Sequence, residues 1–236
     1  MRNFITFNGK MLSDFGVYIS GDSVFDAPVR DTEEIEVPGR NGKLTIDHGR
    51  YKNLPIKYPA FIVREFKSRV EALRNFLLTQ EGYVRLEDTY HPDQFRLAKI
   101  SGDFTVKPIA ELYAGDFDIA FDCYPQRFLK KGEQAIEITA ATTIYNDNRT
   151  EALPLIRAYG TGSFAINGVT VQITAASGYT DIDCELQECY KDTLATNCNN
   201  NVVLTNNKFP SLVSGSNTIT LSGLTKLEIK PRWWVL

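Results

Sequence analysis

Residues 116–134, DFDIAFDCYPQRFLKKGEQ, contain the pattern on which the fold depends. Apolar residues first alternate with acidic or small ones, which is typical of an antiparallel strand with one face buried and the other in water. The alternation stops at Pro125, where a polar, turn-rich run begins. Because such an interruption indicates a domain boundary, we predict one domain over residues 1–130 and a second over residues 131–236.

The segment upstream of this strand contains one stretch with the period of a helix. Between residues 64 and 79, apolar residues recur every three or four positions, and charged residues of both signs lie between them. This spacing predicts a single amphipathic helix that covers one side of a sheet. Asn8-Gly9 and Asn41-Gly42 are hairpin turn signals, and we expect the return strand of the first hairpin at residues 16–19.

The sequence after the predicted boundary has the features of an all-β domain. Asn167-Gly168 separates two runs rich in β-branched and aromatic residues, 164–166 and 169–173, which predicts a tight hairpin. We expect roughly eight short strands in this half, a number typical of a sandwich or jelly roll. The chain as a whole is therefore predicted to be mainly β.

Composition excludes some classes of function and names none. Among 236 residues, 26 Lys and Arg face 29 Asp and Glu, so the formal net charge is -3. This balance argues against a protein that neutralises nucleic-acid phosphates over its surface, and it does little to keep copies of the chain apart. We expect neither a signal peptide nor a membrane partner, because no long apolar run is present. The four cysteines lack zinc-site spacing, and a disulfide among Cys184, Cys189 and Cys198 stays open.

Two acidic rows and two histidines are the candidates for chemistry. Acidic residues that alternate with an apolar face are usually the solvent side of a strand, although a Ca²⁺ site or a glycosidase pair remains an alternative. His48 and His91 lie in turn-like surroundings, and no nucleophile elbow is present. We therefore predict no enzyme activity and assign no catalytic, cofactor or metal residue. The acidic rows consist of Asp116, Asp118 and Asp122, and of Asp181, Asp183 and Glu185.

Short motifs at both ends of the chain carry a resemblance to a known family. Each motif alone is weak, but together they span the chain in a fixed order, and the sequence resembles the phage distal tail proteins of the siphovirus tail-component family. The motifs near the start are FNG at 7–9, VPGRNG at 37–42, GRYKN at 49–53 and Tyr58; those near the end are FPSL at 209–212, GxNxI at 215–219 and PRWW at 231–234.

The resemblance implies a structural hub at the tip of a long non-contractile phage tail. It implies a tail-tube-like β-barrel or sandwich with one α-helix in the first domain, which would form a hexameric ring, and an outward, galectin-like β-sandwich in the second. The implied partners are the tail tube protein, a tail-tip or tail-associated protein and a receptor-binding protein, with DNA only as passing cargo. The implied location is the virion tail tip, after assembly in the host bacterial cytoplasm.

If the chain forms a ring, the segment 37–58 is the candidate for contact between copies. It is polar and turn-rich, and Pro55 and Pro59 indicate edge or loop segments there. We expect it to pack poorly within its own domain and to extend toward a neighbour. The charged candidates for inter-subunit contact are Arg40, Arg50, Lys52 and Lys57.

Two other classes of function remain open. A carbohydrate-binding β-sandwich used in host adsorption would expose Trp233 or Trp234 in a shallow groove, because adjacent strand residues point to opposite faces. A glycosidase would use the strand carboxylates.

Overall fold

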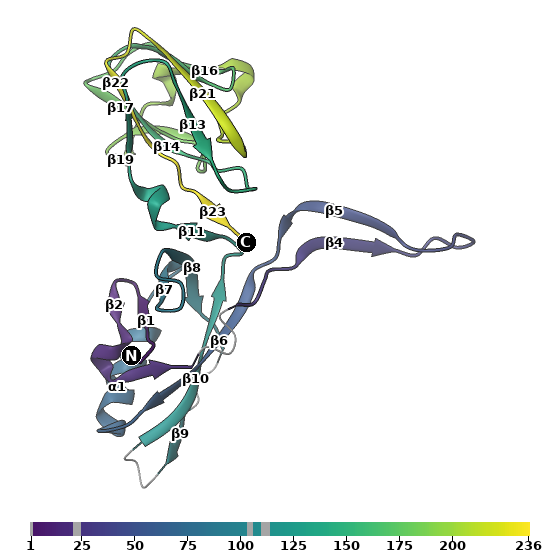
Figure 1. Ribbon diagram of the computed structural model, residues 1–236, viewed down its shortest axis with the longest axis vertical. Coiled ribbons are helices and arrows are strands. Elements are labelled where there is room, and N and C mark those ends of the chain that lie inside the picture. Colours follow the sequence, from purple (N-terminus) through teal and green to yellow (C-terminus); the bar gives the residue numbers. More distant parts are fainter. Residues whose placement is uncertain (1, 21–24, 103–105, 110–113) are drawn as a thin grey trace. The chain divides into compact units, whose positions relative to one another are not determined.

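A computed structural model describes residues 2–20, 25–102, 106–109 and 114–236. Over these residues the chain is mainly β with one α-helix, as predicted. It divides into two compact units, Met1–Arg127 together with Leu236, and Phe128–Val235. The division lies close to the boundary predicted at residue 130, while the roles assigned to the two parts stay predictions. Figure 1 shows the first unit in purple to teal and the second in teal to yellow.

The first unit is built on one antiparallel sheet with the strand order β2-β1-β7-β8-β10-β6-β3, and β9 pairs with β10. Apolar residues alternate with polar ones along its two longest strands, so that one face is buried and the other is open. The strands are β1 (Ile5–Phe7), β2 (Lys10–Met11), β3 (Val17–Ile19), β6 (Leu54–Ile62), β7 (Val84–Asp88), β8 (Gln94–Ile100), β9 (Val106–Ile109) and β10 (Ala114–Cys123).

Helix α1 (Phe66–Leu78) covers the buried face, which confirms the helix predicted over residues 64–79. Its buried side chains are Phe66, Leu73 and Leu77, each of which gains about 2 kcal/mol from leaving water. Phe66 lies directly on Gly115 of β10, where an added Cβ would come within 2.1 Å of the ring. The helix can therefore pack this closely only because residue 115 has no side chain. A short 3-10 helix, η1 (Leu12–Phe15), packs beside α1.

One sequence-based expectation about these strands is wrong, and a second holds in part. The Asn8-Gly9 turn joins β1 to β2, whereas β3 pairs with β6 and not with β1. Pro55 and Pro59 lie inside β6, which pairs with β10 along its whole length, but β3 pairs only with residues 60–62 of β6, so both prolines lie where the other side of β6 is an edge. The carbonyl of Pro59 accepts a hydrogen bond from Ser20 N (2.9 Å), so the proline nitrogen also faces the β3 side and costs no bond to β10.

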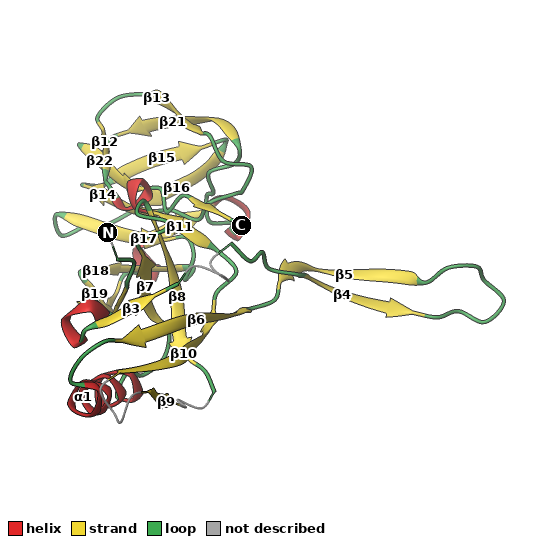
Figure 2. Cartoon of the chain, turned by 60° about the horizontal axis from the view of Figure 1, so that its bottom comes forward, coloured by secondary structure: helices red, strands yellow, loops and turns green. Residues whose placement is uncertain are grey.

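The pair β4 (Arg30–Ile35) and β5 (Leu44–Tyr51) forms a separate two-stranded sheet. Figures 1 and 2 show this hairpin extending away from the sheet of the first unit. We call residues 30–51 the arm. Nearly every residue of its two strands is exposed, so that the arm makes no part of the core.

The second unit consists of two antiparallel sheets around one core. Buried residues of both sheets, including Ile156, Phe164, Ile182 and Ile219, form a single cluster, and the hairpin predicted at Asn167-Gly168 joins β15 to β16. The six-stranded sheet has the order β12-β22-β14-β17-β18-β19, and the five-stranded sheet the order β13-β21-β15-β16-β20. This is a sandwich; its galectin-like type stays a prediction.

The remaining bounds of the second unit are as follows. The strands are β11 (Arg127–Leu129), β12 (Ile136–Ile138), β13 (Thr142–Asn146), β14 (Leu155–Tyr159), β15 (Gly162–Ile166), β16 (Val169–Ile173), β17 (Tyr179–Asp183), β18 (Glu188–Lys191), β19 (Thr193–Asn197), β20 (Val202–Leu204), β21 (Gly215–Ser222), β22 (Lys226–Lys230) and β23 (Trp234–Val235). The 3-10 helices are η2 (Lys130–Glu133), η3 (Asn199–Asn201) and η4 (Thr205–Asn207).

The PRWW motif closes this unit. Arg232 N donates to the carbonyl of Gly132 (2.9 Å), and Leu129 N donates to the carbonyl of Trp233 (2.8 Å). Trp233 is 7% exposed and belongs to the core. Trp234 is half-buried, and its indole Nε1 donates to the carbonyl of Glu151 (2.9 Å). The C-terminal motif therefore ties the last strand to the beginning of the unit.

The acidic row on β17 differs from its prediction. Asp181 and Asp183 are buried rather than solvated, because each accepts two hydrogen bonds from one arginine. Arg157 reaches Asp181 at 2.7 and 2.9 Å, and Arg232 reaches Asp183 at 2.7 and 2.8 Å. Bidentate pairs of this kind compensate for much of the loss of water around the charges. Of the other acidic row, Asp116 and Asp118 are exposed, as expected.

Candidate assembly surface

The arm has two chemically different faces. In its register Ile35 lies opposite Leu44, and Glu33 opposite Ile46, so these four side chains share one face. Apolar members of this face, together with Val37, are 36–40% exposed. We call Ile35, Val37, Leu44 and Ile46 the apolar stripe. The opposite face is polar, with ion pairs between Lys43 and Glu34 (3.1 Å) and between Arg30 and Asp47 (2.9 Å).

The local sequence explains why the arm folds as a hairpin. Residues 38–43 form its tip, where Gly39 and Gly42 adopt left-handed backbone angles (φ 80° and 82°) that other residues rarely take. Arg40 N donates to the carbonyl of Val37 (3.1 Å) and closes a turn. The Asn41-Gly42 signal thus lies within the tip, as the sequence predicted.

Ion pairs also define the base of the arm. Asp31 accepts a hydrogen bond from Arg50 Nε (2.8 Å) and faces Lys52 Nζ at 3.5 Å. The hydrogen bond from Arg50 lowers the pKa of Asp31 below its usual value. At Asp47, the backbone N–H of Gly49 and then the Arg30 guanidinium lower the pKa of the carboxyl group. Both carboxylates therefore ionise at a lower pH than an unpaired aspartate.

The structure brings together two of the four predicted contact residues. Arg50 and Lys52 meet at Asp31, with side chains that are 76% and 59% exposed. Arg40 lies apart from them at the tip, and Lys57 lies on the open face of β6. All four are accessible. The expectation that residues 37–58 pack poorly in their own domain holds for the arm but is wrong for β6, whose Leu54, Ile56 and Tyr58 are buried.

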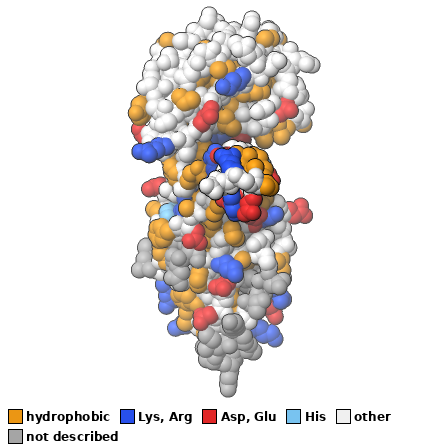
Figure 3. All heavy atoms as spheres, turned by 90° about the vertical axis from the view of Figure 1, so that its right-hand side faces the viewer, with side chains coloured by type: hydrophobic (Ala, Val, Ile, Leu, Met, Phe, Trp, Pro, Cys, Tyr) orange, Lys and Arg blue, Asp and Glu red, His pale blue; other side chains and the backbone are white. Residues whose placement is uncertain are grey.

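The arm is physically incomplete by itself. An isolated two-stranded hairpin is at best marginally stable in water, and an exposed apolar face with a polar rim is typical of an interaction surface. Figure 3, which looks toward the arm, shows hydrophobic, basic and acidic side chains gathered on it. The arrangement thus offers apolar burial framed by charges, which suits protein contact better than chemistry on a small molecule.

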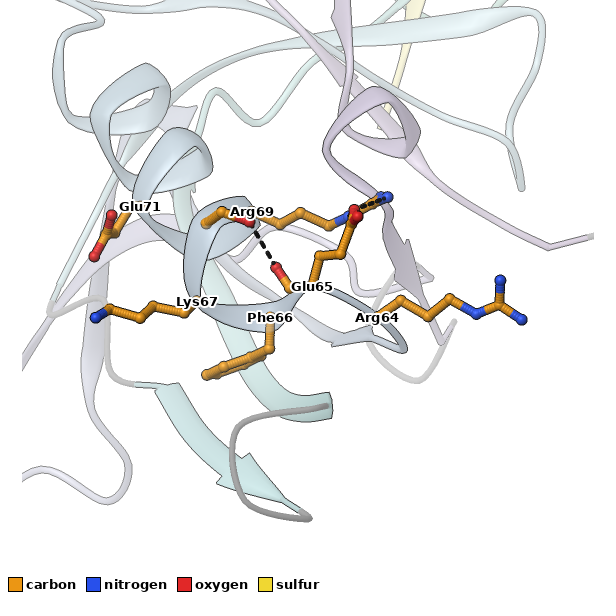
Figure 4. A pocket seen from close by; sticks show the side chains of 7 residues that line it. Arg64, Glu65, Phe66, Lys67, Arg69 and Glu71 are labelled. Atoms are coloured by element: carbon orange, nitrogen blue, oxygen red, sulfur yellow. Dashed lines mark hydrogen bonds and ion pairs between the residues drawn. The ribbon is translucent and has the colours of Figure 1, made fainter.

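A hollow in the surface lies at the beginning of α1. Its lining includes Arg64, Glu65, Phe66 and Lys67. Figure 4 shows Glu65 and Arg69 turned toward one another, and they form an ion pair of 2.7 Å. Its charged side chains carry both signs, and most of them are exposed. Within the described residues, no cluster of metal-ligating side chains is present, and no helix is long and apolar enough to cross a membrane.

Sequence reasoning missed the first strand of the arm and, with it, Ile35 of the apolar stripe. β4 reads RDTEEI, and its polar side chains do not alternate with apolar ones, so no period identifies it as a strand. The usable signal was the hairpin itself. A turn that is followed by the strand LTIDHGRY requires a partner strand on its other side.

Comparison with known proteins places this architecture in a class. Residues 10–123, which include the arm, match the family described as phage tail protein RIFT-related domain. The first unit is therefore similar to a phage tail protein domain. No curated protein sequence matches the chain.

Solved structures extend the likeness to the second unit. The chain is similar over its full length to Dit of phage SPP1, described as a hub of the adsorption apparatus in phages that infect Gram-positive bacteria, with a TM-score of 0.77, 14% identity and 100% of both chains covered. It is also similar to a chain of the phage P2 baseplate in its activated conformation with Ca, with a TM-score of 0.55, 10% identity and 97% of each chain covered. The resemblance to siphovirus tail components is confirmed, and this fold is that of a distal tail hub protein.

Proposed function

We propose that the chain is a structural hub of a long non-contractile phage tail tip. In this proposal copies associate head to tail into a closed hexameric ring, which joins the tail tube to the tip and leaves a passage for DNA. The tail tube protein and a tail-tip protein bind the ring, and the second unit points outward toward a receptor-binding protein. The protein is then a virion component that is assembled in the host cytoplasm.

The observation that carries the proposal is the uncovered apolar stripe. Ile35, Leu44 and Ile46 stay 36–40% exposed in the described part of the chain, and the stripe lies inside the region that matches the tail protein family. A second copy would bury it and complete the two-stranded sheet. Arg40 at the tip of the arm, and Arg50 and Lys52 at its base, would lie at the two ends of this contact as charged groups that fix its direction, and Lys57 on β6 is a further candidate.

A ring with a stripe-mediated contact can be tested with two matched variants. Leu44→Asp places a charge on the apolar stripe, whereas Thr45→Asp places the same charge on the adjacent, polar face of the arm. We expect the wild type and Thr45→Asp to form a closed oligomer in native mass spectrometry, and Leu44→Asp to remain at the 26.6 kDa of one chain. Equal assembly of Leu44→Asp and Thr45→Asp would contradict the role of the stripe. A wild type that stays monomeric both alone and with the tail tube protein would contradict the ring.

The carbohydrate-binding alternative has less support. It needs a solvent-exposed tryptophan, but Trp233 is buried and Trp234 is half-buried and hydrogen-bonded to Glu151. The glycosidase alternative loses one of its two candidate rows, because Asp181 and Asp183 are buried and each is engaged by an arginine.

A further inference from the structure

Two cysteines of the second unit lie opposite each other on neighbouring strands. β18 and β19 pair Tyr190 with Asn197, and one step farther from the turn Cys198 N donates to the carbonyl of Cys189 at 2.7 Å. This is a single bond at the end of the ladder, because Cys189 N donates to the side chain of Asn199. Directly opposed residues of an antiparallel pair have Cα atoms about 4.5–5.5 Å apart, which is within the range that a disulfide spans.

Both thiols also lie on the same side of the sheet. Cys189 is 2% exposed within the core, and Cys198 is half-buried and packs against that core. Cys184 is a poorer partner, because Cys189 pairs with Ile182 and Cys184 is only its diagonal neighbour. Diagonal positions are about 7–8 Å apart, beyond the usual reach of a disulfide.

The backbone around the two cysteines holds this register. Cys189 N donates to the side chain of Asn199 (2.6 Å), and Asn201 N donates to the carbonyl of Cys198 (2.9 Å). β19 itself is an edge strand with every residue exposed, so little else fixes it to the sandwich. A covalent bond at this point would tie the edge strand to β18.

We propose that Cys189 and Cys198 form a disulfide when the protein passes from a reducing to an oxidising environment. This inference rests on the proposed function, because a virion component is assembled inside the cell, where thiols stay reduced, and acts outside it. The three cysteines of this unit are free thiols as the chain folds. The bond is therefore a later modification of the folded protein that stabilises its exposed edge.

A small disulfide such as oxidised glutathione is the oxidant. The more exposed thiol, Cys198, loses its proton and attacks one sulfur of the small disulfide, whose S–S bond breaks and releases one thiol. Cys189 then loses its proton and attacks the Cys198 sulfur, which forms the Cys189–Cys198 bond and releases the second thiol. Two protein thiols are oxidised and one small disulfide is reduced. Burial raises the pKa of Cys189 to about 12, so the second step is the slow one.

The test is a redox titration of the folded, full-length protein. After incubation with oxidised and reduced glutathione, free thiols are alkylated and the mass is measured. We expect the loss of two hydrogen atoms and a cross-linked peptide pair that contains Cys189 and Cys198. The thermal midpoint of the second unit should rise by roughly 5 °C relative to the reduced protein.

Two variants decide between the possible pairs. Cys184→Ser should form the cross-link as the wild type does, whereas Cys198→Ser should lose both the cross-link and the thermal shift. Full alkylation of both cysteines in the wild type, a bond to Cys184, or glutathione that remains on Cys198 would each overturn the inference. The mass readout does not depend on oligomeric state, so a monomeric chain with this bond would contradict only the proposed function.

Discussion

The arm and the closing segment of the second unit both hold an aspartate and an arginine in an ion pair, and they use it differently. Arg50 and Asp31 of the arm are 2.8 Å apart, with side chains 76% and 14% exposed. Arg232 and Asp183 are 2.7 Å apart, with side chains 26% and 2% exposed. The distances are alike, so the difference lies in the surrounding water.

Solvent exposure determines how much each ion pair contributes to the free energy of unfolding. An exposed pair exchanges hydration for a weak, screened attraction and contributes little. A buried pair has already lost its hydration, so either partner alone is costly to the fold. The comparison indicates that the second unit depends on its buried ion pairs for folding, whereas the exposed pairs of the arm contribute little to the free energy of unfolding.

The largest expected effect follows from removal of the buried arginine. Arg232→Met leaves Asp183 without its two guanidinium hydrogen bonds, and we expect the second unit to lose about 3 kcal/mol of its free energy of unfolding. Both tryptophans of the chain lie in this unit, at positions 233 and 234, so urea unfolding followed by tryptophan fluorescence reports on it selectively. The matched variant Arg50→Met, on the arm, should leave the same curve unchanged.

A smaller effect is expected where the closing segment passes over a glycine. A Cβ on Gly132 would lie 2.4 Å from the backbone nitrogen of Trp233, so Gly132→Ala should cost about 2 kcal/mol in the same fluorescence measurement. Gly42 in the arm has no atom within 4 Å of such a Cβ. Its left-handed backbone makes Gly42→Ala unfavourable locally, but the tryptophan signal should not move. If Gly132→Ala is as stable as the wild type, the close approach does not hold the unit together.

The sequence predicted the parts of the fold that have a period. The helix at α1, the alternation along β10 and the Asn167-Gly168 hairpin were all visible, because burial of one face imposes a pattern on neighbouring residues. The partner of β3 could not be predicted in this way, since a turn signal identifies a bend but not which strand returns. The burial of Asp183 could not be predicted for a related reason. Its arginine is Arg232, 49 positions away in the chain.

The assembly surface was predicted only in its charged half. Arg50 and Lys52 were predicted as candidates for contact between copies; both are exposed, and the contact itself stays a prediction. Ile35 was missed, because a single apolar residue at the end of a charged strand has no periodic signal. Only the strand register, which places Ile35 opposite Leu44, shows that it belongs to the apolar stripe.

Acid should lower the stability of the second unit by a smaller amount. Burial raises the pKa of Asp183, but the hydrogen bonds from Arg232 and from the N–H groups of Leu186 and Glu185 outweigh it and leave the pKa below its usual value. A carboxyl group whose folded pKa is depressed stabilises the fold above its unfolded pKa of about 3.9, and this stability is lost as the pH falls through the lower, folded value. We expect the urea midpoint of the second unit to fall between pH 5 and pH 3. In Asp183→Asn, which keeps the acceptor oxygen without titrating, the fall should be smaller; an identical fall would assign the acid sensitivity to other groups.

The smallest effect is expected on the polar face of the arm, where it tests whether an exposed ion pair contributes less than a buried one. Lys43 and Glu34 are 3.1 Å apart, with side chains about half exposed (51% and 56%). Such pairs contribute less than about 0.5 kcal/mol to stability, and salt screens them. Lys43→Ala should therefore change the rates of amide hydrogen exchange in β4 and β5 by no more than about twofold. This change should appear only at low ionic strength. The apolar stripe predicts the opposite behaviour in the assembled protein, where burial of Leu44 and Ile46 should protect these amides at any salt concentration. Protection that disappears in high salt would mean that charge pairs, rather than apolar burial, hold the arm against its neighbour.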